Sequence, residues 1–104
     1  MKLKDLLVEV AEVKGTCPVY KVGMRFLIKD GFRLVSERAL CMHSLLSIAP
    51  YYVALSRGID PRDLGLSKEK NIAFVQCLDP CKLTQGGTVI FAIKVAQNET
   101  AEDR

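Results

Sequence analysis

The sequence lacks the features that would assign it to a special class of protein. It has no internal repeat, no low-complexity segment and no block of like charges, and 49% of its 104 residues are apolar. These values are typical of an ordinary globular domain with one core. Fifteen Lys and Arg against twelve Asp and Glu leave a formal charge of +3. Because the two signs are interspersed and form no basic stripe, we do not expect a nucleic acid as partner.

The N-terminus also lacks the unbroken apolar run of a secretory signal, because Asp5 and Glu9 interrupt it. We therefore expect a cytoplasmic protein. In that reducing compartment the four cysteines are expected as thiols or metal ligands and not as a disulfide framework. Cys77 and Cys81 are nevertheless four positions apart across Asp-Pro, so a turn there could bring them within disulfide reach.

A segment without formal charge runs from residue 39 to residue 56. Its eighteen residues are at the lower limit of a membrane span. Pro50 and His43 lie within it, and the neighbouring strands need a covering element, so we expect a buried helix and no membrane contact. Ser36 can cap this helix at its start, and Pro50 either kinks the helix or divides it in two.

The other apolar segments have the alternation, β-branched residues and flanking turn formers of strands. They predict one α+β domain over residues 1–96, in which a curved antiparallel sheet or small open barrel packs on one Pro-interrupted central helix. Residues 97–104 contain no large apolar side chain and are expected as a frayed polar tail. The expected strands are 3–13, 20–28, 32–35, 72–78 and 88–95, with a hairpin turn at 29–31 and a short helical turn at 60–65.

The residues with the most distinctive chemistry are Cys17, Cys41, His43 and Cys77, because thiolate and imidazole are the ligands that zinc prefers. Four of them make a complete Cys3His set, so our leading hypothesis is a metal site for zinc or iron, or a thiol cluster. The spacing departs from the paired C-x2-C pattern of known zinc sites. Residues two apart in a helix also point about 200° away from each other, so Cys41 and His43 converge only if the helix starts irregularly.

The same residues also fit two other classes of protein. Free cysteine often packs as a small hydrophobe, and a lone histidine is often an ordinary hydrogen-bonded residue. The alternative is therefore a binding or assembly module without chemistry, whose sheet contacts a protein, RNA or a second copy in a homo-oligomer. A third hypothesis is a thiol-dependent enzyme with Cys41 as nucleophile and His43 as base.

Several motifs of the chain resemble a small family of uncharacterised bacterial and archaeal proteins of similar length. They are Cys17-Pro-Val-Tyr-Lys-Val-Gly, Cys41-Met-His, Gln76-Cys-Leu-Asp-Pro and Gly86-Gly-Thr-Val-Ile-Phe. The resemblance covers nearly the whole domain and implies that Cys17, Cys41, His43 and Cys77 recur in the family, but it implies no activity. Two positions depart from the pattern: the family usually has glycine at Cys81 and an acidic residue at Met24.

Overall fold

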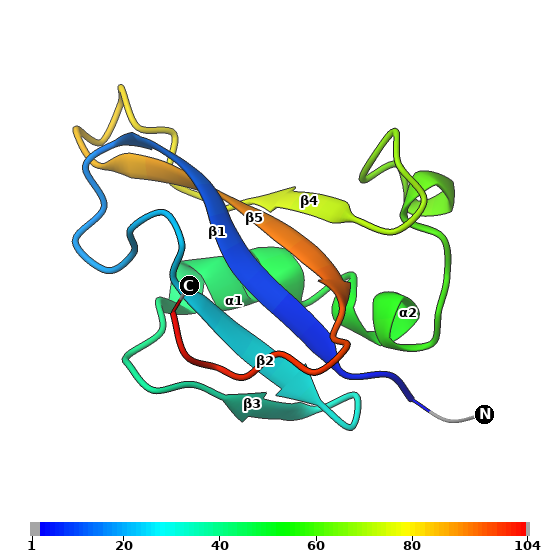
Figure 1. Cartoon of the computed structure of the whole chain (residues 1–104). Coiled ribbons are helices and arrows are strands. Elements are labelled where there is room, and N and C mark those ends of the chain that lie inside the picture. Colours follow the sequence, from blue (N-terminus) through cyan, green and yellow to red (C-terminus); the bar gives the residue numbers. More distant parts are fainter. Residues whose placement is uncertain (1–2, 104) are drawn as a thin grey trace.

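The computed structural model describes residues 3–103, which form an α+β fold around one five-stranded open sheet. All neighbouring strands are antiparallel, and their order across the sheet is β3-β2-β1-β5-β4 (Figure 1). The long β1 and β5 form the centre, and β3 and β4 are the edges. The strands are β1 (Leu6–Gly15), β2 (Arg25–Lys29), β3 (Arg33–Val35), β4 (Ala73–Gln76) and β5 (Gly87–Val95).

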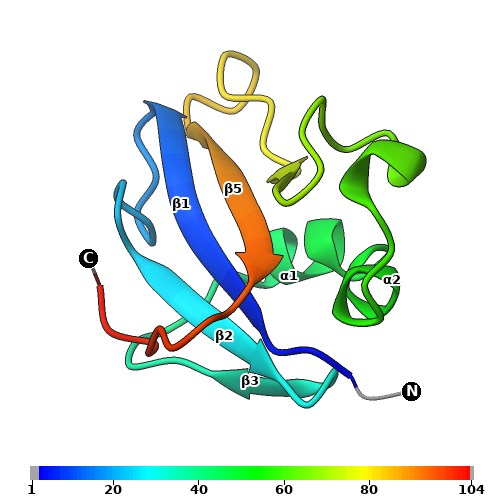
Figure 2. The ribbon, with the colours of Figure 1, turned by 45° about the vertical axis from the view of Figure 1, so that its right-hand side comes forward.

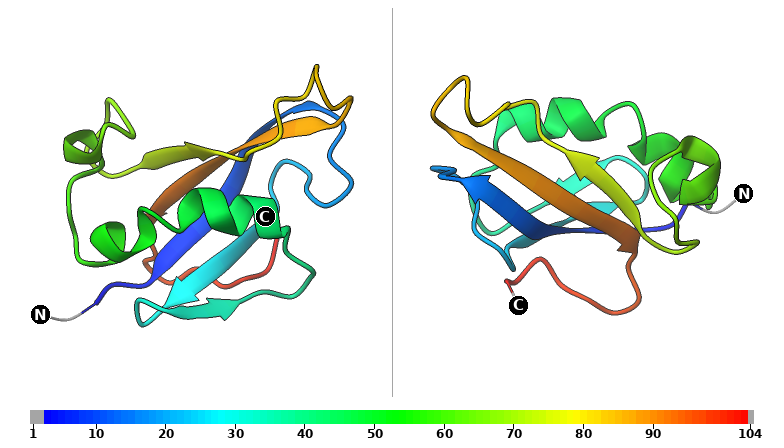
Figure 3. Two further views of the ribbon diagram at one scale, coloured as in Figure 1. Left: turned by 180° about the vertical axis from the view of Figure 1, so that it is seen from behind. Right: turned by 90° about the horizontal axis from the view of Figure 1, so that it is seen from above.

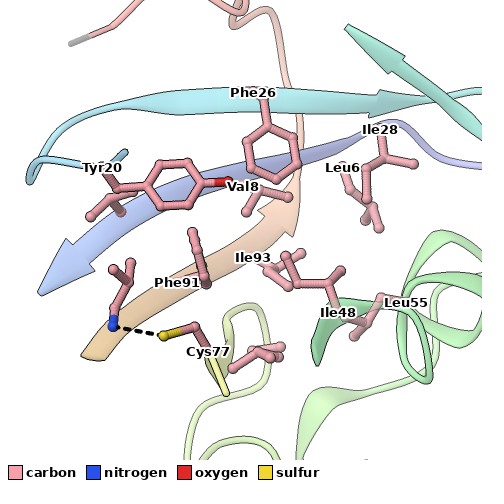
Figure 4. Packing of buried hydrophobic residues seen from close by; sticks show 14 residues of the cluster. Leu6, Val8, Tyr20, Phe26, Ile28, Ile48, Leu55, Cys77, Phe91 and Ile93 are labelled. Atoms are coloured by element: carbon pink, nitrogen blue, oxygen red, sulfur yellow. Dashed lines mark hydrogen bonds between the residues drawn. The ribbon is translucent and has the colours of Figure 1, made fainter. Parts of the chain in front are cut away.

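The alternation of the strand sequences decides which face of the sheet holds the core. In β1 the even positions Leu6, Val8 and Val10 belong to the main hydrophobic cluster, and Phe91 and Ile93 of β5 belong to the same cluster. Their side chains project to the face that carries the helices, because successive residues of a strand point to opposite faces. Figure 4 shows this cluster from Tyr20 at one end to Leu55 at the other.

Two short helices cover that face: α1 (Met42–Ile48) and α2 (Tyr52–Ser56) (Figure 3). The expected single helix interrupted by proline is not confirmed; Pro50 lies in the break between the two helices, where its missing N–H costs nothing. Within residues 3–103 no helix is long and apolar enough to cross a membrane. A 3-10 helix, η1 (Pro61–Leu64), follows at the predicted short helical turn, with Asp60 as its cap.

The helical segment begins later than the sequence predicts. The prediction of a start at Ser36 is wrong, because the hydroxyl of Ser36 donates to the carbonyl of Arg38 (2.8 Å) and accepts from its N–H (3.2 Å). These two bonds stabilise a local bend, and the chain stays non-helical up to Cys41, whose own backbone is extended (φ −83°, ψ 127°). The hydroxyl of Ser36 therefore stabilises a loop and does not cap a helix.

The C-terminal segment packs on the opposite face of the sheet, away from the helices (Figure 2). Ala101 is buried against Leu7 and Leu27. The Nε of Arg25 donates to the carbonyl of Glu102 (2.8 Å), and the guanidinium of Arg38 pairs with the carboxylate of Asp103. The sequence predicted a frayed tail here and indicated none of these contacts, since only one small side chain is buried.

Candidate functional site

Tyr20 occupies the end of the core where β1 finishes, and it organises the surrounding polar groups. Its side chain is 3% exposed. Its ring packs edge-on against Phe91 of β5, with the ring centroids 5.3 Å apart (Figure 4). A buried phenol needs hydrogen-bond partners for its hydroxyl, and the partners in this structure come from the segment that starts α1.

Cys17 lies in the turn that connects β1 to Tyr20. Its Sγ accepts the N–H groups of Val19 (3.4 Å) and Tyr20 (3.3 Å), so the turn wraps the backbone around the sulfur. Gly15 ends β1 with a φ of 77°, which glycine adopts freely. A Cβ there would lie 2.4 Å from the carbonyl oxygen of Gly86. The turn that contains Cys17 is therefore fixed before the cysteine by the close approach of Gly86, and after it by the two N–H groups that bind the sulfur.

Cys41 reaches the same tyrosine from a distant part of the chain. Its N–H donates to the Tyr20 hydroxyl (3.0 Å), and this hydroxyl also shares a hydrogen bond with the Ser44 hydroxyl (2.7 Å). Ser44 is fully buried and donates to the carbonyl of Cys41 (2.6 Å). The three residues therefore satisfy each other's buried polar groups and anchor the start of α1 to the sheet.

The pKa of Tyr20 depends on burial, on hydrogen bonds and on the two neighbouring cysteines. Burial is the main cause that raises the pKa of Tyr20, while the hydrogen bonds of Ser44 and of the Cys41 backbone act to lower it. The thiols of Cys41 and Cys17 each add to the rise in the pKa. Both thiols are only partly buried, so reagents and ions can reach them from solvent.

Cys77 lies directly after β4, inside the hydrophobic cluster. It is 8% exposed, and its Sγ accepts the N–H of Val89 (3.2 Å) and lies 3.8 Å from the carbonyl oxygen of Gly87. In Figure 4 the ring of Phe91 lies between Cys77 and Tyr20. Cys77 thus packs as a core residue bound to the edge of β5.

His43 is exposed on the first turn of α1. Its positive form contributes, as the smallest of several causes, to the lowered pKa of Asp79, whose main cause is the hydrogen bond from Thr84. The imidazole is therefore within electrostatic range of Asp79 in the loop between β4 and β5. Over residues 3–103, no hydrogen bond joins the imidazole to the thiol of Cys41, and the enzyme hypothesis remains a prediction.

The four predicted ligands are therefore divided by the fold. Cys17 and Cys41 contact opposite ends of Tyr20, its backbone N–H and its hydroxyl, whereas Cys77 lies beyond Phe91 and His43 is exposed on α1. In the part of the chain that the structure describes, no three His, Cys, Asp or Glu side chains are grouped so that they could hold a metal ion.

Cys81 has a separate structural position in the β4–β5 loop. It adopts a φ of 62°, in the region that glycine favours, and its Sγ lies 3.6 Å from the carbonyl oxygens of Lys14 and Gly86. All four cysteines are free thiols, so Cys77 and Cys81 are not joined.

Sequence reasoning missed Tyr20 and Ser44, the residues that join the Cys17 turn to the start of α1. The sequence placed Tyr20 in the expected strand 20–28 and Ser44 in the uncharged segment 39–56. The motif Cys17-Pro-Val-Tyr contained a usable signal, because a tyrosine three residues after a cysteine can place its N–H on the sulfur. No protein-family model, no curated protein and no solved structure matches the chain.

Proposed function

We propose that the chain is a small thiol-bearing domain in which Cys17 and Cys41 bind a thiophilic metal ion, with zinc or iron as the candidates. The observation that supports this most strongly is that both cysteines contact Tyr20. Cys17 accepts the N–H of Tyr20 through sulfur, and Cys41 donates its own N–H to the Tyr20 hydroxyl. Residues separated by 24 positions therefore share one anchor.

The chemistry of the pair supports the same proposal. Thiolates are strong zinc and iron ligands, and N–H groups that point at a sulfur stabilise the negative charge that it carries when it binds a metal. Both thiols are partly exposed, which gives an ion a path to them. The reducing cytoplasm that the sequence predicts would keep them free of disulfides. The predicted four-ligand set also includes His43 and Cys77, which the fold places apart from this pair.

The test is a cobalt titration of protein purified without a histidine tag and stripped of metal. Co2+ reports thiolate ligation through a charge-transfer band in the near ultraviolet. We expect the band in the wild type and in Cys81→Ser, which is a matched control because Cys81 is also a partly buried free thiol. Cys17→Ser and Cys41→Ser should each weaken cobalt binding at least about tenfold.

Two further variants define the rest of the ligand set. If His43→Gln and Cys77→Ala also weaken the band, the predicted Cys3His set is supported; if neither does, the metal is held by the thiol pair and water. A wild type without the band, or a Cys17→Ser variant that binds as tightly as the wild type, would rule out the proposal. The predicted module without chemistry would then be the better explanation.

A further inference from the structure

A cleft of about 610 Å³ opens at the opposite end of the β1–β5 pair from Cys17. Lys4 and Leu6 line it from the start of β1, and Ile93 to Val95 line it from the end of β5. Its other walls are the end of α2, the segment 58–61 and residues 70–72. The volume is within the range of pockets that bind small molecules.

The floor of the cleft is the hydrophobic core itself. Leu6 and Ile93 are each 1% exposed and Leu55 is 5% exposed, so only small parts of these packed side chains face the cleft. Ile59 forms part of the wall and is 45% exposed. An apolar ligand body would cover Ile59 and complete the contacts of the floor, which is favourable because it removes apolar surface from water.

Two of the three charged side chains on the rim of the cleft are cationic. Lys4 and Lys70 stand against one carboxylate, that of Asp60, and leave a net charge of +1. The carboxylate of Asp60 is already bound by Arg62, whose Nη2 donates to Oδ2 (2.8 Å). Lys94 also contributes to the lining, but its side chain points to the opposite face of the sheet, like that of its partner Leu7, and its Nζ lies 3.9 Å from Oε2 of Glu99. The positive charges are therefore incompletely neutralised by the protein.

Local hydrogen bonds fix the walls in place. The N–H of Lys4 donates to the carbonyl of Ser56 (2.7 Å), which ties the chain before β1 to the end of α2. The side chain of Asp60 accepts the N–H of Arg62 (2.9 Å) and caps η1. A preformed cleft with an apolar floor and a cationic rim fits one kind of ligand better than any other.

We propose that this cleft binds a small amphipathic organic anion, a carboxylate on an aliphatic or aromatic body. The apolar body lies on the floor of Leu6, Leu55 and Ile93 and against Ile59, and the carboxylate lies at Lys4 and Lys70. This site is independent of the thiols, because its lining residues belong to the other end of the sheet.

The first experiment compares four probes by calorimetry and by amide chemical shifts of the full chain. Octanoate carries both features, n-octanol lacks the charge, n-octylammonium reverses it, and acetate lacks the body. We expect octanoate to bind and to shift the amides of Ile59, Asn71 and Ile72. Each other probe should bind at least about tenfold more weakly, since each loses either the charge-assisted hydrogen bonds or the apolar contact.

The second experiment assigns the charge to the rim. Lys4→Gln and Lys70→Gln should each weaken octanoate binding about tenfold. Lys82→Gln removes an exposed lysine in the β4–β5 loop, outside the cleft, and should leave binding unchanged. Octanoate that does not bind, that shifts amides elsewhere, that binds no better than octylammonium, or that responds equally to Lys82→Gln would overturn the proposal.

Discussion

The two ends of the β1–β5 pair differ in whether their polar groups are buried and bonded to one another or face solvent. At the end that contains Cys17 and Cys41, which we call the thiol end, the polar groups of Tyr20, Ser44 and Cys41 are buried and bound to one another. At the end that contains the cleft, which we call the lysine end, the charged groups surround an apolar floor and face solvent. Groups of the first kind stabilise the fold, and groups of the second kind are available to a ligand.

The comparison shows that burial alone does not identify a functional site. The thiol end has the more unusual residues, yet much of its bonding is internal and would be needed even in a protein without a metal. The lysine end has ordinary residues, but their charges lack equally good internal partners. Substitutions at one end at a time therefore distinguish effects on stability from effects on ligand binding.

Phe91→Ala should have the largest effect, because Phe91 joins the two ends. It is fully buried, contacts Tyr20 and lies on the strand that also carries Ile93. Loss of its ring should lower the free energy of unfolding by about 3–5 kcal/mol. Chemical denaturation followed by circular dichroism measures the loss.

Phe74→Ala is the matched control, since Phe74 is 41% exposed and belongs to the neighbouring strand β4. It should change the free energy of unfolding by about 0.5 kcal/mol or less. Equal effects of the two substitutions would show that the core does not centre on Phe91.

Tyr20→Phe should be the next largest disturbance and should be confined to the thiol end. It removes the acceptor of the Cys41 N–H and a partner of the buried Ser44 hydroxyl. An unsatisfied buried group of this kind costs about 1–3 kcal/mol in the free energy of unfolding. Cobalt binding should weaken in the same variant, while octanoate binding at the lysine end should stay as in the wild type.

Tyr52→Phe is the control for the loss of a tyrosine hydroxyl on α2, where the side chain is only partly buried. It should leave both the stability and the cobalt band unchanged. If Tyr20→Phe weakened octanoate binding as much as cobalt binding, the two ends would not be independent sites.

Gly58→Ala should disturb the lysine end by a smaller amount. Gly58 has a φ of 83°, and a Cβ there would lie 3.4 Å from Cε of Lys4. The contact is ordinary, but the left-handed backbone costs alanine about 1–2 kcal/mol. We expect this loss in denaturant unfolding, with amide shifts limited to the cleft and an unchanged cobalt band.

Gly58→Asn tests the cause of the loss, because asparagine tolerates the left-handed conformation better than alanine. It should recover part of the stability that Gly58→Ala loses. An asparagine variant as unstable as the alanine variant would point to a steric cause at Lys4 instead.

The sequence predicted the parts of the fold that depend on local patterns. The strand alternation of residues 88–95 and the turn at Asp30-Gly31 are both present, with φ of 58° and 85° at the turn residues. The start of α1 was missed because its support is tertiary: Cys41 is held by the hydroxyl of Tyr20, and no nearby cap marks the position.

The sites were predictable only in part for the same reason. Residue type identified Cys17 and Cys41 as candidates, but nothing local showed that both would contact Tyr20 while Cys77 would not. The lysine end gave no signal at all, because Lys4 and Lys70 are far apart in the sequence and line one cleft only in the folded chain. Chemistry can be inferred from residue types, whereas convergence depends on long-range pairing.

The smallest predicted effect is a pH dependence that separates the two ends. The pKa of Tyr20 is raised, chiefly by burial, so the folded protein keeps the phenolic proton at a pH where the unfolded chain has lost it. The folded state then binds more protons, and stability falls as pH rises above about 10. Below that pH both states hold the proton, and the contribution of Tyr20 is constant.

The measurement is the difference in free energy of unfolding between the wild type and Tyr20→Phe over a series of alkaline pH values. Lysines and other tyrosines titrate in the same range, but both proteins contain them. Their effects on the free energy of unfolding therefore cancel in the difference. We expect the stability advantage of the wild type to shrink as pH rises through the pKa of Tyr20 in the folded state. A constant difference would mean that the Tyr20 hydroxyl ionises as easily in the core as in water, which would contradict burial as the main cause of its raised pKa.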